Sequence, residues 1–312
     1  MRTFGKNWRW LLGATILAVA ATAVSLRWFG STKRAAGSEP AAALEPIDVP
    51  PLRETSSLRP AIRQILDPST PPRQRIDLVM DCDPDLTGKE LEAFLAEVAT
   101  PMNAGEDVGW HSQYLHEICR QLQSHDPVRP RFARVLAGVA LAGDRPRVER
   151  DYAIQHLRQV WHRAADDPDL RRSILESFRS LAEAGPEVAG AGMLSLHFVG
   201  CDPKKPWNST SAALANSEIE PLIASVLKSD PITTDAGVLM AALRVAGDRR
   251  LAESATRVEE IAADISAPAV VRMAAVSVIA RSGGDSAAVL QAIDRTDPRV
   301  DQAVRFALNK SR

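Results

Sequence analysis

The chain has 312 residues, of which 45% are apolar and 25% charged, the balance of a globular protein with one large or two ordinary domains. The formal net charge is −1, so no overall field attracts nucleic acid, and we predict no nucleic-acid partner. Aromatic residues make up only 5%, and runs of β-branched and aromatic residues are scarce, which argues against a β-sheet.

A long uncharged run lies near the N-terminus. After the short flank of residues 1–9, the sequence from Trp10 to Leu26 carries no charged residue. At 1.5 Å per residue this run spans roughly 26 Å, close to the hydrocarbon thickness of a bilayer. We therefore predict a single transmembrane helix at residues 10–28, acting as a signal anchor.

Tryptophans flank the predicted span, as expected of side chains that prefer the membrane interface: Trp8, Trp10 and Trp28. Equal numbers of basic residues lie on the two sides of the span, so the positive-inside rule does not decide the orientation of the helix. N-terminal anchors of this design usually keep the N-terminus in the cytoplasm, and we predict a single-pass protein of the cytoplasmic membrane with the C-terminal domain outside. The alternative is a cleaved signal peptide and export, because residues 21–23, Ala-Thr-Ala, form a small-x-small cleavage site.

Residues 29–57 are rich in proline and alanine and have no helical stripe of any length. Such a composition is typical of a semi-rigid spacer, so we predict a linker that holds the following domain away from the bilayer.

From residue 58 to residue 312 apolar residues recur at helical spacing in one segment after another, which predicts an all-α domain. The predicted helices are Arg59–Leu66, Pro72–Met80, Gly88–Val98, Val108–Leu122, Val128–Leu141, Arg147–Arg163, Asp169–Ala182, Pro186–Val199, Ile219–Leu227, Ile232–Val245, Arg249–Ala263, Ala269–Ser282, Ser286–Ile293 and Arg299–Leu308. The helix at Ala269–Ser282 is apolar nearly all round and should be covered on most sides, whereas Arg299–Leu308 is amphipathic and should cap one end.

An internal repeat is visible in the positions of proline and glycine. The same interval separates a proline from a later Gly-Asp pair three times, at Pro127 and Gly143, Pro231 and Gly247, and Pro268 and Gly284. Proline fits the first turn of a helix and glycine its end. A helix-turn unit that recurs in this way indicates a stacked array, an α-solenoid of six or seven helix pairs.

The repeated segments resemble the HEAT and HEAT-like (PBS lyase-type) repeat family. The resemblance lies in Asp297-Pro298-Arg299-Val300, in Pro268-Ala-Val-Val-Arg272-Met-Ala274 and in Asp126-Pro127-Val with Arg131 and Ala133. It implies a helical solenoid of the kind found in scaffolds and adaptors, and in some enzyme-associated proteins such as bilin lyase subunits. It implies no catalytic residue in this chain.

The predicted function is therefore that of a membrane-anchored scaffold or adaptor for protein–protein interaction, with an unknown protein partner. The alternative is an accessory subunit or an enzyme that binds a ligand in the concave groove of the solenoid. Neither GxSxG nor HExxH occurs in the sequence, so we predict no catalytic residues and no cofactor.

The acidic run at residues 81–92 allows two interpretations. Asp81, Asp83, Asp85 and Glu92 match ligand positions of an EF-hand calcium loop, but the sixth position should be glycine and is Leu86. A helix start with Thr87 as N-cap and Glu90 three residues later is the preferred interpretation.

Histidines and cysteines provide no convincing metal site. His111, His116, Glu117 and Cys119 lie on one predicted helix, but no second ligand pair accompanies them, so we predict surface histidines and a core cysteine, and no metal. His156 and His162 are expected to be partly exposed. The three cysteines, Cys82, Cys119 and Cys201, are interpreted as small buried hydrophobic residues, with one disulfide as an alternative.

The segment of residues 201–217 interrupts the helical rhythm with prolines and two lysines. Loops inserted into solenoids often lie on the binding face, so Lys204, Lys205 and Trp207 are candidate partner-binding residues. The alternative is a connector with Trp207 folded back onto the stack.

Overall fold

The computed structural model describes residues 42–47, 49–50, 55–103, 105–199, 216–231, 234–282 and 286–310. All of these belong to one structural unit, Ala41–Arg312. The predicted membrane helix with its flank and tryptophans, and the loop with Lys204, Lys205 and Trp207, lie outside the described residues. Within the described ranges, no helix is both long and apolar enough to cross a bilayer.

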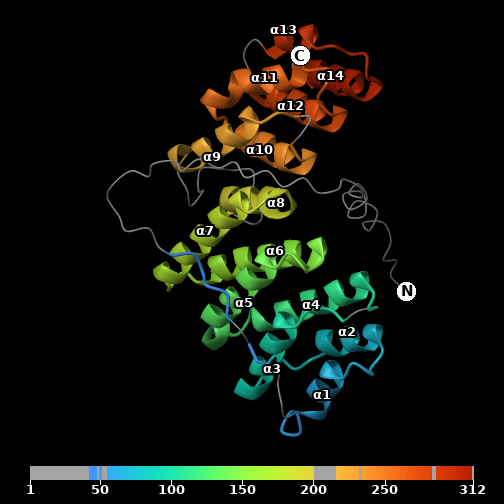
Figure 1. The fold of residues 1–312 in the computed structure, drawn as a ribbon, viewed down its shortest axis with the longest axis vertical. Helices are drawn as coiled ribbons and strands as arrows, with labels where there is room; N and C mark the ends of the chain where they lie inside the picture. Colours follow the sequence, from blue (N-terminus) through green and yellow to red (C-terminus); the bar gives the residue numbers. More distant parts are fainter. Residues whose placement is uncertain are drawn as a thin grey trace, which may run out of the picture. The chain divides into compact units, whose positions relative to one another are not determined.

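The described residues form α-helices and short 3-10 turns, with no β-strand (Figure 1). The α-helices are α1 (Pro60–Leu66), α2 (Pro72–Met80), α3 (Gly88–Ala99), α4 (Val108–Leu122), α5 (Arg129–Leu141), α6 (Arg147–Arg163), α7 (Pro168–Glu183), α8 (Pro186–Phe198), α9 (Asn216–Lys228), α10 (Ala236–Arg249), α11 (Ala255–Ala263), α12 (Ala269–Ser282), α13 (Ser286–Ala292) and α14 (Pro298–Lys310). The 3-10 turns are η3 (Asp126–Val128) and η5 (Ala252–Ser254).

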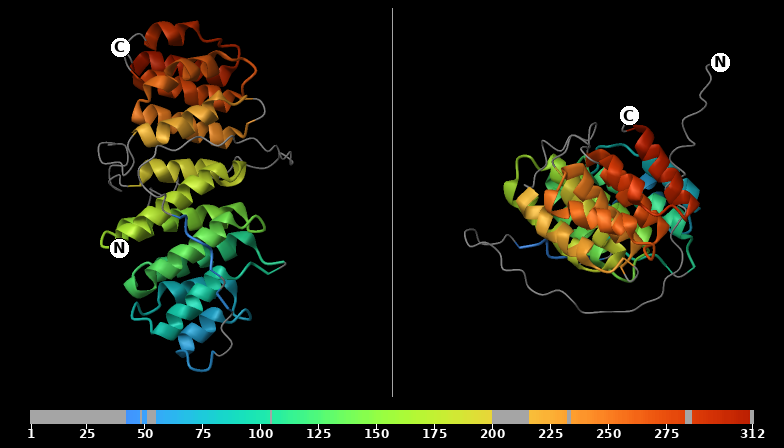
Figure 2. Two further views of the ribbon diagram at one scale, coloured as in Figure 1. Left: turned by 60° about the vertical axis from the view of Figure 1, so that its left-hand side comes forward. Right: turned by 90° about the horizontal axis from the view of Figure 1, so that it is seen from above.

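The helices stack in file as two layers. Each odd-numbered helix packs against the even-numbered helix that follows it, which makes seven pairs among the described helices. Every even-numbered helix from α2 to α12 also packs against the next even-numbered helix, so this layer is continuous (Figures 1 and 2). The prediction of an all-helical fold that fits an α-solenoid of six or seven helix pairs is confirmed.

Two helices at the C-terminal end lie as their apolar patterns predict. Helix α12, apolar nearly all round, contacts α10, α11, α13 and α14. Helix α14 buries Val300, Val304 and Ala307 and leaves Arg305 exposed. Because only one of its faces is apolar, α14 can end the stack.

Helix starts are fixed by side chains that accept hydrogen bonds from the first free backbone N–H groups. Asp107 caps α4 and Asp167 caps α7 in this way. Thr87 and Glu90 form the complete capping box at the start of α3, as predicted. The same Glu90 also binds Arg59, with 2.7 Å between Glu90 Oε1 and Arg59 Nε. The acidic run at residues 81–92 is therefore a helix start, in which the Glu90 carboxylate binds the backbone N–H of Thr87 and the side chain of Arg59.

The boundaries of α10 differ from the prediction. The helix begins at Ala236, not at Ile232, because the Asp235 side chain accepts hydrogen bonds from the N–H groups of Gly237 and Val238. It continues through Gly247 and ends where Arg250 adopts a left-handed conformation with φ of 53°. Gly247 therefore does not end the helix. The interval between Pro231 and Gly247 does not mark the start and end of α10 as the repeat pattern predicted. The predicted helix from Arg249 is likewise shorter, because η5 precedes α11.

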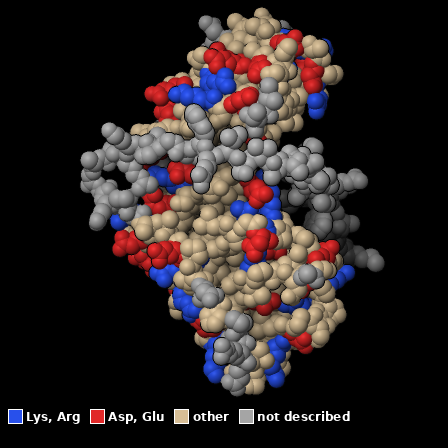
Figure 3. All heavy atoms as spheres, viewed as in Figure 1, with Lys and Arg blue, Asp and Glu red and all other residues tan. Residues whose placement is uncertain are grey.

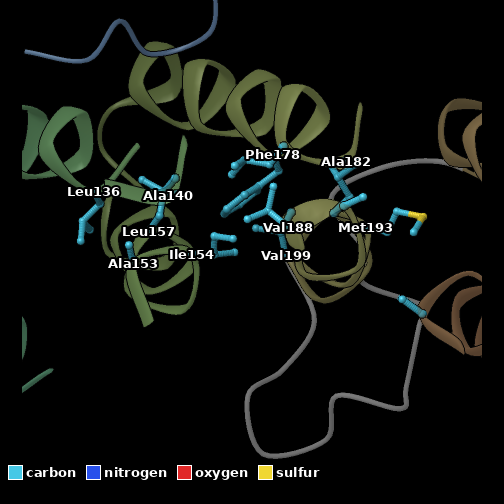
Figure 4. Close-up of a cluster of buried hydrophobic side chains, with 14 of the residues drawn as sticks. Leu136, Ala140, Ala153, Ile154, Leu157, Phe178, Ala182, Val188, Met193 and Val199 are labelled. Carbon is cyan, nitrogen blue, oxygen red and sulfur yellow. The ribbon is translucent and has the colours of Figure 1, made fainter. Parts of the chain in front are cut away.

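The core lies between the two layers. Figure 4 shows its middle part, where Leu136 of α5, Leu157 of α6, Phe178 of α7 and Val188 of α8 converge. All four side chains are almost completely buried. Burial of apolar surface between successive pairs is what holds a solenoid together, because no single pair can cover its own apolar face.

A buried arginine recurs near the start of three even-numbered helices. Arg75, Arg150 and Arg272 each follow a proline in the pattern Pro-x-x-x-Arg. The Nε–H of each donates to the carbonyl oxygen ten residues earlier, at 2.7, 3.0 and 3.1 Å respectively. These carbonyls lie in the last turn of the preceding odd-numbered helix, where helix geometry leaves them without a partner. Each arginine also binds the next pair; for example, Arg272 donates to the carbonyl of Asp294 at 2.8 Å.

A short non-helical segment, of which residues 42–47 and 49–50 are described, packs against α5 and α7, although it falls inside the predicted linker. The backbone N–H of Leu44 donates to Ser177 Oγ at 2.9 Å, and Leu44 and Val49 are both buried. Pro46 approaches Gly138 so closely that a Cβ there would lie 3.3 Å from the proline ring. This part of residues 29–57 is thus bound to the helices and is no free spacer (blue trace in Figure 1).

The histidines of α4 and α6 form a buried network. His156 is almost fully buried, which corrects the prediction of partial exposure; it contacts Gln123 and lies 3.0 Å from His116 between ring nitrogens. Burial lowers the pKa of His156 to about 3, and it also lowers the pKa of His116. His111, which was predicted to lie at the surface, is only 10% exposed, and its Nδ1 lies 2.7 Å from Glu149 Oε1.

The two cysteines in the described part of the chain are free thiols. Cys119 is buried, as predicted, whereas Cys82 is only partly buried, and Cys201 lies outside the described residues. In the described ranges, no three His, Cys, Asp or Glu side chains are grouped to hold a metal ion.

Candidate binding groove between helices α10 and α12

A cavity of about 330 Å³ lies on the surface where α10 and α12 run side by side. It is lined by Met240, Arg244, Asp248, Ala274, Ser277, Val278 and Arg281. We call this cavity the α10–α12 groove. Its size lies at the lower end of the range of pockets that hold small ligands or a few residues of a peptide.

Helical spacing explains why these side chains share the groove. Met240, Arg244 and Asp248 are separated by one turn each on α10, so they form a single row along one face. Ala274, Ser277 and Arg281 form the corresponding row on α12. The two rows run in the same direction, and Arg281 and Asp248 meet at the end of the groove nearer the helix C-termini.

The floor of the groove depends on Gly247. A Cβ at this position would lie 2.9 Å from a methyl group of Val278, closer than real Cβ contacts come. The absence of a side chain therefore lets α10 and α12 approach each other. The groove is consequently a partly open depression over a tight helix contact.

Asp248 is the centre of the charged end of the groove. Its carboxylate binds Arg281, lies 3.5 Å from Nε of Arg244, and lies 3.3 Å from Nε2 of His197 on α8. Burial by itself would raise the pKa of Asp248, but the hydrogen bond with His197 and the charges of Arg281 and Arg244 outweigh burial, so its pKa lies below the ordinary value. The carboxylate is thus charged at neutral pH.

Exposure separates the charges of the groove by sign. The Asp248 side chain is only 8% exposed, whereas those of Arg244 and Arg281 are 42% and 50% exposed. A ligand in the groove therefore meets two guanidinium groups before it meets the carboxylate. On the face shown in Figure 3, acidic and basic side chains are interspersed.

The groove contains residue types that occur in hydrolases, but their geometry does not form a catalytic group. His197 is fully buried, and its two ring nitrogens already face Asp248 and Arg249. Ser277 donates its hydroxyl hydrogen bond to the carbonyl of Met273 at 3.0 Å. A serine nucleophile needs an adjacent base with a free nitrogen. The described residues of the groove instead provide apolar walls and fixed charges.

None of the residues that line this groove was predicted from the sequence to bind a partner. Lys204, Lys205 and Trp207 lie outside the described residues, so their role stays a prediction. The residues that do form the groove carried a weak signal, the Arg244-x-x-x-Asp248 spacing on one helix, which is common on any solvated helix. Its partner Arg281 lies on another helix, and only tertiary packing brings the three together.

A second cavity lies among α3, α4, α5 and α6, and its lining includes Leu115, His116 and Val139. Its volume is about 10 Å³, which is too small for any organic ligand.

Comparisons with known proteins assign this chain to no family. No protein-family model matches the sequence, and no curated protein matches it. Among solved structures, human deoxyhypusine hydroxylase in complex with glycerol is similar to this chain, with a TM-score of 0.33 and 13% sequence identity. The match covers 80% of this chain and 94% of that chain. Similarity at this level supports no argument about the fold or the function of this chain.

Proposed function

We propose that this protein is a helical-repeat scaffold or adaptor that binds a partner protein in the α10–α12 groove. The observation that carries the proposal is a preformed groove with apolar walls and two exposed guanidinium groups on an otherwise closely packed stack of helices. A rigid solenoid surface binds a partner without the entropy cost of ordering itself. The groove contains no pair of nucleophile and free base, which favours binding over catalysis as its function.

We further propose that residues 10–28 hold the solenoid at a membrane, with the helical domain outside the cytoplasm. The sequence alone supports this part, through the uncharged run and the flanking tryptophans. Extraction of membranes with alkaline carbonate tests it: an anchored protein stays in the pellet, and a peripheral one is released. Added protease then reports the side on which the helical domain lies.

Site-specific cross-linking tests the binding function. A photoreactive amino acid replaces Ser277, which is exposed in the groove, in the full-length protein in its own cells. The matched control places the same group at Glu259, which is exposed on α11 in the other helix layer. We expect discrete adducts with another protein from position 277 and none of the same mass from position 259. Identical adducts from both positions, or none from position 277, would contradict the proposal.

A further inference from the structure

The charge layout of the α10–α12 groove restricts the ligands it can hold. The accessible charges belong to Arg244 and Arg281, while Asp248 lies beneath them. Cations therefore meet repulsion at the mouth of the groove, and anions meet hydrogen-bond donors. Guanidinium groups bind carboxylate and phosphate through short charge-assisted hydrogen bonds, so the ligand group in contact with them is an anion.

The number of charges distinguishes between anions. Two arginines and one ionised carboxylate give the groove lining a formal charge of one positive unit. A single carboxylate neutralises this charge. A phosphate group, with a charge of about −1.5 to −2 at neutral pH, would leave an excess of negative charge beside Asp248 and near the negative ends of two helices. The groove is therefore matched to a monoanion.

The other end of the groove is apolar. Met240 and Ala274 lie about one helical turn before Arg244 and Ser277, and Val270, which is also exposed, lies a further turn back on α12. One turn advances about 5.4 Å, and two residues of an extended chain advance about 6.6 Å with both side chains on the same face. An extended peptide can thus place an apolar side chain against Met240 and an acidic side chain, two positions away, against the arginines.

We infer that the α10–α12 groove recognises an extended segment of a partner protein with an apolar residue and an acidic residue two positions apart. This inference rests on the proposed function and specifies the partner's chemistry. Arg281 is the main anchor, because it reaches Asp248 from the opposite helix and closes the charged end of the groove. The Asp248 carboxylate positions both guanidinium groups and does not contact the ligand itself.

Fluorescence anisotropy with defined peptides tests the inference on the purified full-length protein. The probes are labelled, C-terminally amidated peptides in a Gly-Ser background that contain Leu-Ser-Glu, Leu-Ser-Gln, Gly-Ser-Glu or Leu-Ser-phosphoserine. We expect the Leu-Ser-Glu peptide to bind about tenfold more tightly than each of the other three, the loss expected when a charge-assisted hydrogen bond or an apolar anchor is removed.

Two variants locate the effect. Arg281→Gln should abolish the preference for Glu over Gln, whereas the control Arg305→Gln, which removes an exposed arginine paired with Asp301 on α14, should preserve it. The inference is overturned if the Gln peptide or the phosphopeptide binds as tightly as the Glu peptide, or if the preference survives Arg281→Gln. Failure of all four peptides would also overturn it, while position-specific adducts from residue 277 would still support the binding function.

Discussion

The buried junctions of the stack and the α10–α12 groove use the same residue type in opposite ways. On α12 alone, Arg272 is 3% exposed and donates to two backbone carbonyls, while Arg281 is half exposed and pairs with a carboxylate at the surface. The difference follows from helical position. An arginine in the first turn lies beside the carbonyls that end the preceding helix, and an arginine two turns later faces the neighbouring even-numbered helix and solvent. Side chains of the first kind should determine stability, and those of the second kind should determine binding.

The largest effect is expected from Arg272→Ala. The substitution leaves the buried carbonyl of Ala262 without its donor and also removes the part-buried bond to the Asp294 carbonyl, and we expect a loss of about 3 kcal/mol in the free energy of unfolding, measured by urea denaturation. Arg272→Met removes the same hydrogen bonds but retains most of the aliphatic packing, so its loss of stability measures the contribution of the hydrogen bonds alone. If Arg272→Ala is as stable as the parent protein, the arginine of the Pro-x-x-x-Arg pattern does not stabilise the stack.

Two glycines of α8, one in a tight contact and one in a looser contact, provide the next comparison. A Cβ at Gly192 of α8 would lie 2.5 Å from the backbone nitrogen of Ala182, and the backbone of α7 cannot move away without disturbing the core. We expect Gly192→Ala to destabilise the protein by about 2 to 3 kcal/mol. Gly190→Ala on the same helix, where the nearest atoms are at 3.4 Å or more, should be neutral or slightly stabilising because alanine favours the helix. Thermal unfolding of both variants decides the point, and equal effects would contradict it.

The histidine network predicts a pH dependence of stability. The pKa of His156 is about 3 in the folded protein and about 6.5 when the chain is unfolded. Below pH 6.5 the unfolded state therefore binds more protons than the folded state, and stability falls as the pH falls. Between pH 7 and pH 5 we expect a loss of about 2 kcal/mol from this residue, at 1.36 kcal/mol per pKa unit.

Urea denaturation of the parent protein and of His156→Gln at both pH values measures this loss. The variant should lose less stability than the parent on acidification, although the lowered pKa of His116 leaves part of the dependence in place. The carboxylates with lowered pKa values, such as Glu149 and Asp248, lose their contribution only at lower pH, so the interval from 7 to 5 isolates the histidines. Equal losses in both proteins would contradict this account.

A smaller effect is expected where residues 42–50 meet the helices. Ser177→Ala removes the acceptor for the buried N–H of Leu44, and we expect a loss of about 1 kcal/mol in the free energy of unfolding. The control Ser173→Ala keeps the Ser177 hydroxyl, and its backbone carbonyl still accepts from it. If Ser177→Ala has no effect on unfolding or on proteolysis near residue 50, the segment contributes nothing to stability.

The smallest stability effect is expected in the groove itself. Arg281→Gln removes an ion pair whose guanidinium is half exposed, while Asp248 keeps its contacts with Arg244 and His197, so we expect a loss of about 0 to 1 kcal/mol and an almost unchanged unfolding midpoint. This result would show that loss of peptide binding in the same variant is not a consequence of unfolding. A loss as large as that of Arg272→Ala would contradict the proposed difference between the two regions.

The sequence by itself determined the all-helical fold, the approximate number of helix pairs and most helix boundaries. These depend on local rules: apolar residues at helical spacing, proline in the first turn, and capping residues such as Thr87 with Glu90. Prediction failed at α10, because the interval between Pro231 and Gly247 suggested a helix frame that the Asp235 cap and the conformation of Arg250 override. Gly247 marks a close contact with Val278 and not a helix end.

Only the tertiary structure decided which side chains line the groove and which are buried in the core. Arg244 and Asp248 are close in sequence, but Arg281 and His197 come from other helices, and no local pattern links them. The burial of His156 and the packing of Leu44 against Ser177 could likewise not be predicted from the sequence, because both depend on atoms far away along the chain. Helix formation depends on neighbours within about four residues, whereas a site between stacked helices depends on packing between residues separated by thirty or more positions.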